Sequence, residues 1–443
     1  MRIPAPLVLV GAALILVGST LPSRATELWR DGDAVIELSG SVRELLTVTN
    51  GTDPERFSRA LVEAGCFSLP RFADCPAFDH VGDRDEWESL TRLRVQFDAN
   101  VGSRWSAQLV YDLEARAGII DGLFAVPGAV EDTFLGLEDR LGEATGRHAQ
   151  VHRVYRGWLR LEEGPLRVTV GRQRIPWGVG RLWNPIDRFN AIGPLALEGD
   201  QSLGIDAVDV RWSFSGFNQL QLVYAPATRS ADARYALRFQ AVIRDIDVGV
   251  MVGRFEQAFS AGFDLAGNLG DSAWRVEAVW TDPHRSAVTL GRGLQEVDRF
   301  WQVVASFDHN IDIGTGIYLL VEHLWDQNAL GFGPGGRAGS LVALFQAPGV
   351  PVSADRFAGS GVVSLVSHQT GATIGYDLGS SARGDLLLLW DWRGQSAAIA
   401  PILTFTGFND AELSIGAQFY TGSKRSQYGG QEALVYALAE WFF

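Results

Sequence analysis

A period of two in hydropathy, repeated along most of the chain, limits the folds open to this sequence more than any other feature. In residues 90–101 the even positions from Arg92 onward are charged or polar, and the odd positions from Leu93 onward are apolar. Residues 105–116 repeat the pattern after a turn at 102–104. Because successive side chains of a strand point to opposite faces, both segments are predicted strands with one charged and one apolar face. Strands of this kind separate water from lipid when they close into a barrel.

The same alternation recurs near residues 274–280, 301–310, 385–393 and 412–419. The connections between strands alternate in length as well. Short ones fall near 102–104, 162–165, 215–218, 244–247, 268–272, 310–314, 379–383 and 409–411, and long ones near 50–89, 116–149, 179–203, 283–299 and 328–360. The sequence therefore predicts an all-β fold, a single transmembrane antiparallel up-and-down β-barrel of about 18 strands with short periplasmic turns and long extracellular loops. A count of about 16 strands is the alternative.

Both ends of the chain carry features of an exported protein. Residues 1–25 combine Arg2, an apolar run and small residues up to Ala25, which predicts a signal peptide; a membrane anchor is the less favoured interpretation. Residues 26–443 then form the barrel domain. Every second residue back from Phe443, beginning with Trp441, is apolar, which resembles the C-terminal assembly signal of Gram-negative outer-membrane barrels. We expect this location, with outer-membrane lipid, lipopolysaccharide and the barrel assembly machinery as partners.

The composition supports a membrane barrel and argues against other classes. No apolar run after residue 25 is long enough for a transmembrane helix, yet the chain has 14 tryptophans, a residue that gathers at membrane interfaces. The net charge of −14 gives no basis for nucleic-acid binding. Cys66 and Cys75 lie in one polar segment of a chain expected to be exported, so a local disulfide is predicted.

Residues 170–188 contain four arginines, although the chain as a whole is acidic. If the strand alternation continued through this segment, Arg172 and Arg174 would face lipid, where an arginine near the bilayer centre costs about 2–4 kcal/mol. We therefore predict that the strand becomes irregular near Gly171 or Pro176. A bulge re-aims the side chains that follow it, and proline cannot donate a ladder hydrogen bond.

Residues 178–203 are then predicted to leave the wall as a constriction loop, which gathers its arginines beside those of the wall. Trp177 is expected to pack near these guanidinium groups. In the strand 150–162 the inward face is expected to carry Arg156 and Arg160, with Tyr155 on the outer face. The full set of predicted lumen or constriction residues is Arg156, Arg160, Arg167, Arg172, Arg174, Trp177, Arg181, Asp187, Arg188, Asp206, Asp209 and Arg211.

Two interpretations of these arginines stay open at the level of sequence. Guanidinium groups that face a lumen attract and orient carboxylates, phosphates or sulfates. Alternatively, they pair internally as salt bridges that line the barrel, with Glu162, Glu163, Asp187, Asp206 and Asp209 as partners. Acidic strand residues such as Asp112 and Glu277 also oppose a preference for anions.

Two short motifs in this region carry a resemblance to a known group of proteins. The stretch "GRQRIPWGVGRL" at 171–182, followed by "GIDAV" at 204–208, resembles the outer-membrane barrels of the alginate-export type and related porin-like families. The matching residues are Gly171, Arg172, Gln173, Trp177, Gly178, Arg181, Leu182, Gly204, Asp206 and Val208. The resemblance implies an electropositive lumen.

The predicted function is a porin-like channel for small hydrophilic solutes, with a preference for anions or acidic sugars. The alternative is a non-conducting barrel, a sleeve or scaffold for a periplasmic or lipoprotein partner or a surface ligand. An enzyme is not expected, because the strand pattern brings no serine, histidine and carboxylate together. Residues 331–336 are rich in glycine but lack the Lys-Ser/Thr ending of a phosphate loop. Neither a cofactor nor a metal is predicted.

Overall fold

The computed structural model describes residues 25–51, 84–118, 134–140, 148–190, 193–198, 204–228, 230–255, 258–282, 287–289, 294–296, 299–327, 329, 364, 366–423, 426–429, 431 and 433–443. Three predictions fall outside these residues. They are the signal peptide apart from Ala25, the disulfide between Cys66 and Cys75, and most of the predicted long loops.

Nearly all regular structure in the described residues is β-strand. The strands are β1 Thr26–Asp31, β2 Ala34–Gly51, β3 Arg84–Val101, β4 Trp105–Gly118, β5 Glu138–Arg140, β6 His148–Glu163, β7 Leu166–Gln173, β8 Ile205–Ser215, β9 Asn218–Ala225, β10 Arg234–Ile243, β11 Ile246–Phe255, β12 Ala258–Leu269, β13 Ser272–Asp282, β14 Ala287–Thr289, β15 Leu294–Glu296, β16 Phe300–Ile311, β17 Ile317–Asp326, β18 His368–Asp377, β19 Ala382–Asp391, β20 Ser396–Phe408, β21 Ala411–Thr421 and β22 Leu434–Phe442. Within the described residues a 3₁₀ turn, η4, covers Ser230–Asp232. No helix in this part of the chain is long and apolar enough to cross a membrane.

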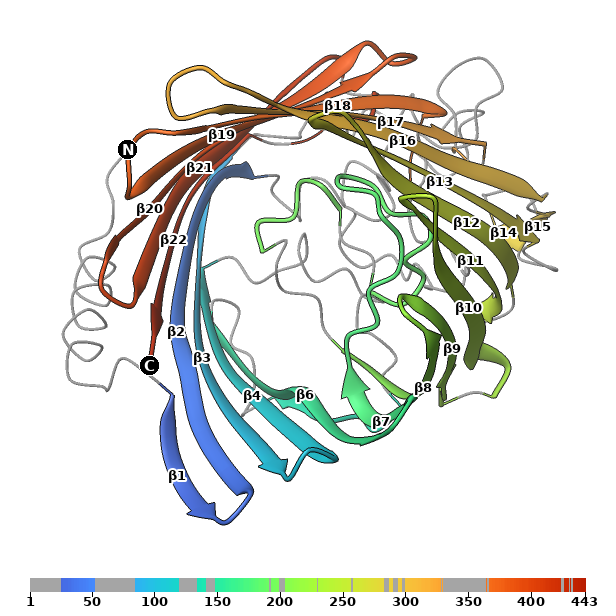
Figure 1. Ribbon diagram of the computed structural model, residues 1–443. Helices are drawn as coiled ribbons and strands as arrows, with labels where there is room; N and C mark the ends of the chain where they lie inside the picture. The colour runs from blue at the N-terminus through green and yellow to red at the C-terminus, as the bar shows by residue number, and fades with distance from the viewer. Residues whose placement is uncertain are drawn as a thin grey trace.

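Eighteen of the described strands form one closed barrel, seen along its axis in Figure 1. Neighbouring strands pair antiparallel around the ring, and β22 closes it by pairing with β2. This arrangement confirms the predicted up-and-down barrel and its strand count. Two short strands extend the sheet: β1 pairs with β2 beyond the end of β22, and β5 pairs with β6 beyond the end of β7. Strands β14 and β15 form a separate hairpin.

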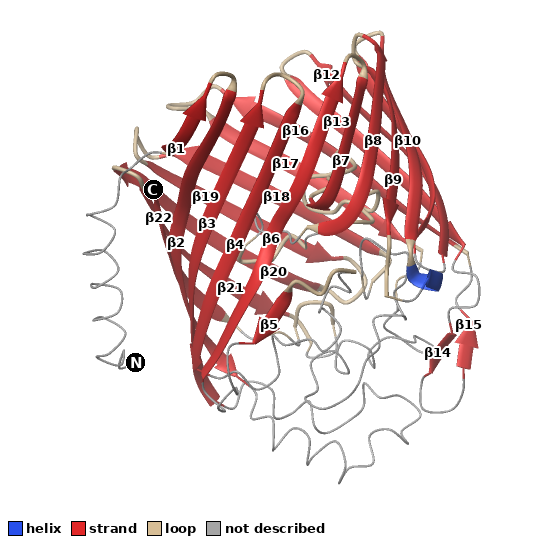
Figure 2. Ribbon diagram, turned by 90° about the horizontal axis from the view of Figure 1, so that it is seen from below, coloured by secondary structure: helices blue, strands red, loops and turns tan. Residues whose placement is uncertain are grey.

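The two ends of the barrel differ in the length of their connections. Turns of a few residues join β3 to β4, β8 to β9 and β12 to β13, at the top of Figure 2. The long connections, such as those from β2 to β3 and from β17 to β18, join strands at the opposite end. Short turns face the periplasm in outer-membrane barrels. The predicted alternation of short turns and long loops is therefore confirmed.

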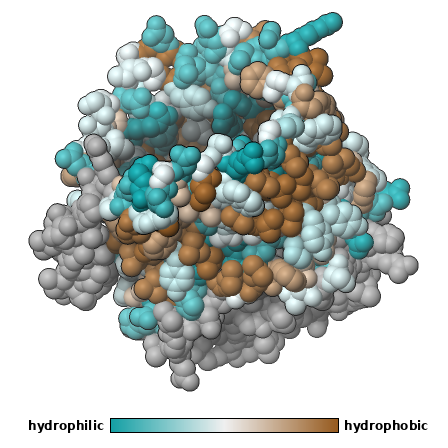
Figure 3. Space-filling model, turned by 60° about the horizontal axis from the view of Figure 1, so that its bottom comes forward, coloured by the Kyte–Doolittle hydropathy of each residue, from teal (hydrophilic) through white to brown (hydrophobic). Residues whose placement is uncertain are grey.

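The barrel is apolar outside and polar inside. In β4, Leu109 and Leu113 are 45% and 38% exposed, whereas Asp112 and Glu114 are almost completely buried. Figure 3 shows apolar side chains gathered on the outer face of the ring. An apolar surface of this extent needs lipid rather than water around it, so the barrel belongs in an outer membrane.

The last residues of the chain close the barrel next to β2. Trp441 pairs with Val42 of β2, and Phe443 exchanges two backbone hydrogen bonds with Gly40, at 2.8 and 2.9 Å. These contacts fix the end of β22 in the wall. The role of Trp441 and Phe443 as an assembly signal stays a prediction.

Candidate functional site

A segment of the chain leaves the wall between β7 and β8 and runs inside the ring, drawn in green in Figure 1. We call its described residues, 174–190 and 193–198, the inner loop. It follows a strand irregularity at Gly171, where φ is +118° and a Cβ would lie 2.2 Å from the carbonyl oxygen of Gly157. Only glycine suits this backbone conformation and this close approach. The backbone is therefore irregular at Gly171, as predicted. A bulge is not the cause, because β7 pairs with β6 and with β8 in continuous register through Gly171 and Arg172.

The irregularity at Gly171 is followed by an arginine that is buried rather than lipid-facing. The guanidinium of Arg172 binds Asp206 on β8 through two hydrogen bonds, Nε to Oδ1 at 3.0 Å and Nη2 to Oδ2 at 3.1 Å. Its Nη1 donates to the carbonyl oxygen of Val154 at 2.8 Å. Parallel hydrogen bonds of this kind are the strong form of the arginine–carboxylate pair. Arg172 is thus an internally paired residue.

Aromatic side chains at the start of the inner loop pack against the inner face of the wall. The rings of Trp177 and Phe189 meet edge to face with centroids 5.0 Å apart, and both meet Phe255 on β11 in a similar way. Trp177 also donates its Nε1 to Gln221 on β9 at 3.0 Å. The guanidinium found near Trp177 is that of Arg238 on β10, 5.6 Å from its ring centroid. Trp177 therefore packs on a wall arginine that the sequence did not single out.

The rest of the inner loop continues around the wall. Trp183 packs in a cluster with Leu324 on β17 and Leu389 on β19. Leu197 packs against a third cluster that contains Leu45 on β2 and Leu434 on β22. Full burial of an apolar side chain contributes about 1.5–3 kcal/mol to the stability of the folded state. Packing of this kind, repeated from β9 around to β2, fixes the path of the inner loop inside the barrel.

Two buried wall glutamates bind the backbone of the inner loop; we call Glu277 on β13 and Glu322 on β17 the clamp glutamates. The donors to Glu277 are the N–H groups of Val179, of Gly180 at 2.5 Å and of Ile186 at 3.3 Å. The donors to Glu322 are those of Arg181 at 2.8 Å, Leu182 at 2.9 Å and Trp183 at 2.7 Å. Neither carboxylate has an ion-pair partner in the described part of the chain. Backbone amides therefore supply the hydrogen bonds that a buried carboxylate needs.

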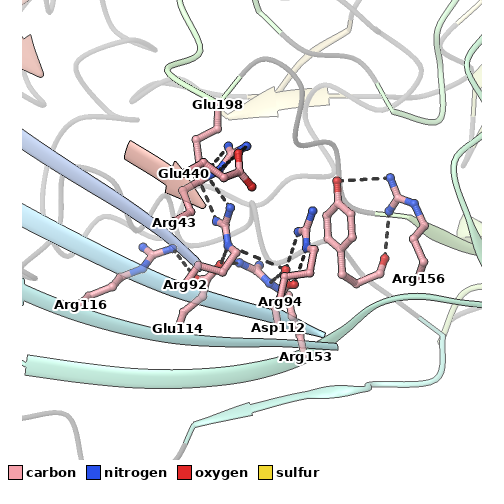
Figure 4. A network of polar contacts seen from close by, with 11 residues as sticks. Arg43, Arg92, Arg94, Asp112, Glu114, Arg116, Arg153, Arg156, Glu198 and Glu440 are labelled. Atoms are coloured by element: carbon pink, nitrogen blue, oxygen red, sulfur yellow. Dashed lines mark hydrogen bonds and ion pairs between the residues drawn. The ribbon is translucent and has the colours of Figure 1, made fainter. Parts of the chain in front are cut away.

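Arginines line the inner face of β2, β3, β4 and β6, across the ring from β13 (Figure 1). We call this group of arginines the basic wall; it consists of Arg43, Arg92, Arg94, Arg116, Arg153 and Arg156. Arg94 binds Asp112 through two hydrogen bonds of 2.7 Å, and Arg92 Nε binds Glu114 at 2.7 Å. In the network of Figure 4 five of these guanidinium groups share four carboxylates, those of Asp112, Glu114, Glu198 and Glu440, whereas that of Arg156 contacts Tyr155. Among the residues drawn there, the arginines outnumber the carboxylates.

A β-bulge in β6 changes which side chains face the lumen. The register of β6 against β4 shifts at Tyr155, so the outward position predicted for Tyr155 is wrong. Its ring instead lies between two guanidinium groups, 3.7 Å from that of Arg94 and 4.2 Å from that of Arg156. Because the bulge inserts one extra residue, Arg153 and Arg156 both reach the basic wall. Stacking on Tyr155 helps to fix these guanidinium groups.

Several predicted lumen residues are paired on β6, β7 and β8. Arg211 binds Asp209 at 2.8 Å, and Arg167 binds Glu162 at 2.6 Å. The guanidinium of Arg160 lies 4.4 Å from the ring centroid of a tryptophan on its own strand. Internal pairing therefore accounts for part of the predicted set.

The four arginines of residues 170–188 do not gather at one place as the sequence suggested. Arg172 stays in the wall next to β8, whereas Arg188 lies against β13, where its Nη2 donates to Thr281 at 2.9 Å. The side chains of Arg174 and Arg181 are exposed and make no hydrogen bond or ion pair within the described residues. Arg174 and Arg181 are thus the two members of this stretch whose charge is open to solvent.

The inner loop also contains a buried carboxylate outside the membrane-spanning strands. Asp187 accepts hydrogen bonds from the N–H groups of Phe189 at 3.1 Å and Asn190 at 2.7 Å. Burial raises the pKa of Asp187 to about 6, although these two hydrogen bonds act in the opposite direction. Asp187 is therefore a titratable charge of the inner loop in the range between acid and neutral pH.

Sequence reasoning missed most of the basic wall and one of the clamp glutamates. The alternation does place Arg92, Arg94 and Glu277 on inward faces. The register then sets Arg92 directly opposite Glu114 and Arg94 opposite Asp112 on β4. That register depends on pairing between strands, and no local pattern in the sequence specifies which inward side chains meet.

No protein-family model and no curated protein matches this sequence. Among solved structures, the chain resembles OccK5 (OpdH) of Pseudomonas aeruginosa, with 6% sequence identity, a TM-score of 0.50, and coverage of 91% of this chain and 98% of that chain. It also resembles OccAB1 of Acinetobacter baumannii, with 11% identity, a TM-score of 0.51, and coverage of 95% and 98%. These likenesses are likenesses of fold, that of a porin-like outer-membrane barrel.

Proposed function

We propose that this protein is a passive outer-membrane channel for small hydrophilic solutes that carry a carboxylate or another anionic group. The basic wall carries this proposal: six arginines line one side of the lumen in a barrel of eighteen strands. A barrel of this size has room for an aqueous path unless loops fill it. The inner loop narrows that path and adds the exposed side chains of Arg174 and Arg181.

The chemistry of guanidinium suits this task. Its planar fork matches a carboxylate, stays charged at every physiological pH and is less strongly hydrated than an ammonium group. A solute that passes several such groups in succession exchanges one partner for the next. Conduction requires binding that is favourable enough for entry and weak enough for exit. Carboxylates already present in the wall, such as Asp112 and Glu114, keep the guanidinium groups that they bind from holding a solute too tightly.

Several finer features belong to the same proposal. Acidic sugars are the solute class that the resemblance to the alginate-export type favours. We further propose that residues 1–25 are removed on export, that Cys66 and Cys75 form a disulfide, and that lipopolysaccharide and the barrel assembly machinery are partners. In this proposal the protein moves solutes without chemical conversion and without a cofactor.

A non-conducting barrel is the second candidate, and one observation favours it. The inner loop packs against the wall from β9 around to β2 through three apolar clusters. A lumen occluded by this packing would suit a sleeve or scaffold for a periplasmic or lipoprotein partner.

Recording from the refolded protein in planar lipid bilayers separates the two candidates. The channel proposal predicts stepwise conductance and, under a KCl gradient, a zero-current potential of the sign that chloride permeation produces. Absence of conductance steps from a correctly folded barrel, as judged by heat-modifiable gel mobility, would overturn it. A zero-current potential of the opposite sign would leave a channel but overturn the anion preference.

A further inference from the structure

One carboxylate that binds the basic wall comes from the inner loop and not from a barrel strand. Glu198, near the end of the inner loop, accepts hydrogen bonds from Arg92 Nη1 at 2.6 Å and Nη2 at 3.0 Å, and from Arg43 Nη1 at 3.2 Å. Figure 4 shows Glu198 reaching both guanidinium groups from the side opposite their strands. Its side chain is 21% exposed, whereas those of Arg43 and Arg92 are 5% and 6% exposed.

Both arginines have a second carboxylate partner within the wall. Arg43 Nε binds Glu440 on β22 at 3.0 Å, and Arg92 Nε binds Glu114 on β4 at 2.7 Å. These bonds hold the two guanidinium groups on the wall independently of the inner loop. Glu198 binds their terminal nitrogens, the atoms that an arginine presents to a carboxylate in a two-pronged pair.

The backbone around Glu198 is anchored by other contacts. The carbonyl of Leu195 accepts a hydrogen bond from Gln418 on β21 at 2.8 Å, and Leu197 packs in an apolar cluster that contains Leu45. Within the described residues, the carboxylate of Glu198 accepts hydrogen bonds from the two arginines alone. Rotation of this side chain away from the wall therefore costs only its ion pairs, and it does not require the loop to detach.

We propose that Arg43 and Arg92 form a binding subsite for the carboxylate of a passing solute, and that Glu198 occupies this subsite when no solute is bound. A solute carboxylate takes the place of Glu198 on the terminal nitrogens, and the return of Glu198 displaces it again. The inference rests on the proposed function, because it assumes that anionic solutes reach the basic wall. Beyond the proposed function, Arg43 and Arg92 are assigned the binding of the solute carboxylate, and Glu198 is assigned the competition for them.

The competition has a measurable consequence. If Glu198 fills the subsite nine-tenths of the time, the apparent affinity for a solute carboxylate falls about tenfold, since only the unoccupied fraction is competent to bind. The Glu198→Gln variant removes the competing charge and keeps the size of the side chain. We expect this variant to bind carboxylates about tenfold more tightly than the wild type.

Single-channel recording with acetate as the probe tests the proposal. Acetate is titrated at constant chloride, and the concentration that gives half-maximal reduction of the chloride current is compared between wild type and Glu198→Gln. Acetamide, which has the same shape without the charge, is the control solute. Glu162→Gln is the control variant, because it removes a carboxylate of β6 that pairs with Arg167 on β7 and leaves the subsite intact.

We expect the half-maximal acetate concentration to fall about tenfold in Glu198→Gln and to stay unchanged in Glu162→Gln. Equal values for wild type and Glu198→Gln would overturn the subsite while leaving the channel proposal in place. Conduction without any effect of acetate would overturn both the subsite and the preference for carboxylate solutes. If Glu198→Gln does not fold, Glu198→Asp takes its place. The shorter acid is expected to compete less well and to shift the acetate value in the same direction.

Discussion

The clamp glutamates and the basic wall lie across the ring from each other and neutralise buried charge by different means. Glu277 and Glu322 form no ion pair within the described residues and bind six backbone N–H groups of the inner loop. In the basic wall, carboxylate side chains bind guanidinium groups, and the inner loop contributes the carboxylate of Glu198. The difference indicates a division of labour. The glutamate side fixes where the loop runs, and in the proposed channel the arginine side presents charge to a solute.

The strongest test of this division is removal of the clamp. In the double variant Glu277→Ala and Glu322→Ala, six N–H groups of the loop lose their acceptors. An unsatisfied buried amide costs about 1–3 kcal/mol, so we expect the loop to detach from β13 and β17. Single-channel conductance should then rise severalfold, with larger current noise.

A matched control removes two carboxylates that do not contact the loop, Glu162 and Glu163, by substitution with Gln. Its conductance should stay close to that of the wild type. Equal conductance of the clamp variant and this control would show that apolar packing alone holds the loop.

The second prediction concerns Arg172 and Arg181, which lie close together in the sequence but are expected to have different roles. Arg172→Ala leaves the buried Asp206 without its guanidinium, which typically costs about 3–5 kcal/mol, so the barrel should lose heat stability. Arg181→Ala removes an exposed charge with no ion-pair partner in the described residues, so anion selectivity should fall and stability should stay. Gel mobility after heating and the zero-current potential, measured on both variants, check this contrast. Loss of selectivity in Arg172→Ala with unchanged stability would contradict it.

The architecture could be predicted from the sequence because it depends on local patterns. Alternation revealed the strands, turn residues revealed the short connections, and the cost of arginine in lipid pointed to an irregularity at Gly171. The site could be predicted only in part. Whether Arg188 meets Arg156 or Thr281 depends on the path of a loop through the lumen, and the bulge that turns Tyr155 inward has no local signature. The role of the clamp glutamates could not be predicted from the sequence, because the groups that they bind are backbone amides, which every residue except proline possesses.

A smaller effect is expected at the start of the inner loop. Gly171→Ala forces a Cβ to within 2.2 Å of the Gly157 carbonyl oxygen at a φ of +118°. Such strain costs about 1–3 kcal/mol, so the temperature at which the barrel unfolds on a gel should drop. Gly164→Ala, at a periplasmic turn with open space around the site, is the matched control for a glycine of positive φ. An equal drop in both variants would show that the close approach to Gly157 is unimportant.

The smallest effect concerns pH. Because burial raises the pKa of Asp187 to about 6, the folded protein takes up a proton there as the pH falls from neutral. The protonated form therefore stabilises the folded loop at low pH, and this contribution is lost as the pH rises through about 6. Loss of one negative charge should also make the channel more anion-selective at about pH 5 than at about pH 7.5. Asp187→Asn should show a smaller difference between these two zero-current potentials, and an unchanged difference would exclude Asp187 as its source.

The most direct test of the division of labour is the zero-current potential under a KCl gradient, measured together with conductance for Arg94→Gln and Glu322→Gln. Arg94 belongs to the basic wall, and Glu322 binds the loop backbone. We predict that Arg94→Gln reduces anion selectivity at nearly unchanged conductance, whereas Glu322→Gln raises conductance and keeps the wild-type sign of selectivity. The reverse pattern, a change of conductance in Arg94→Gln and a loss of selectivity confined to Glu322→Gln, would contradict the account.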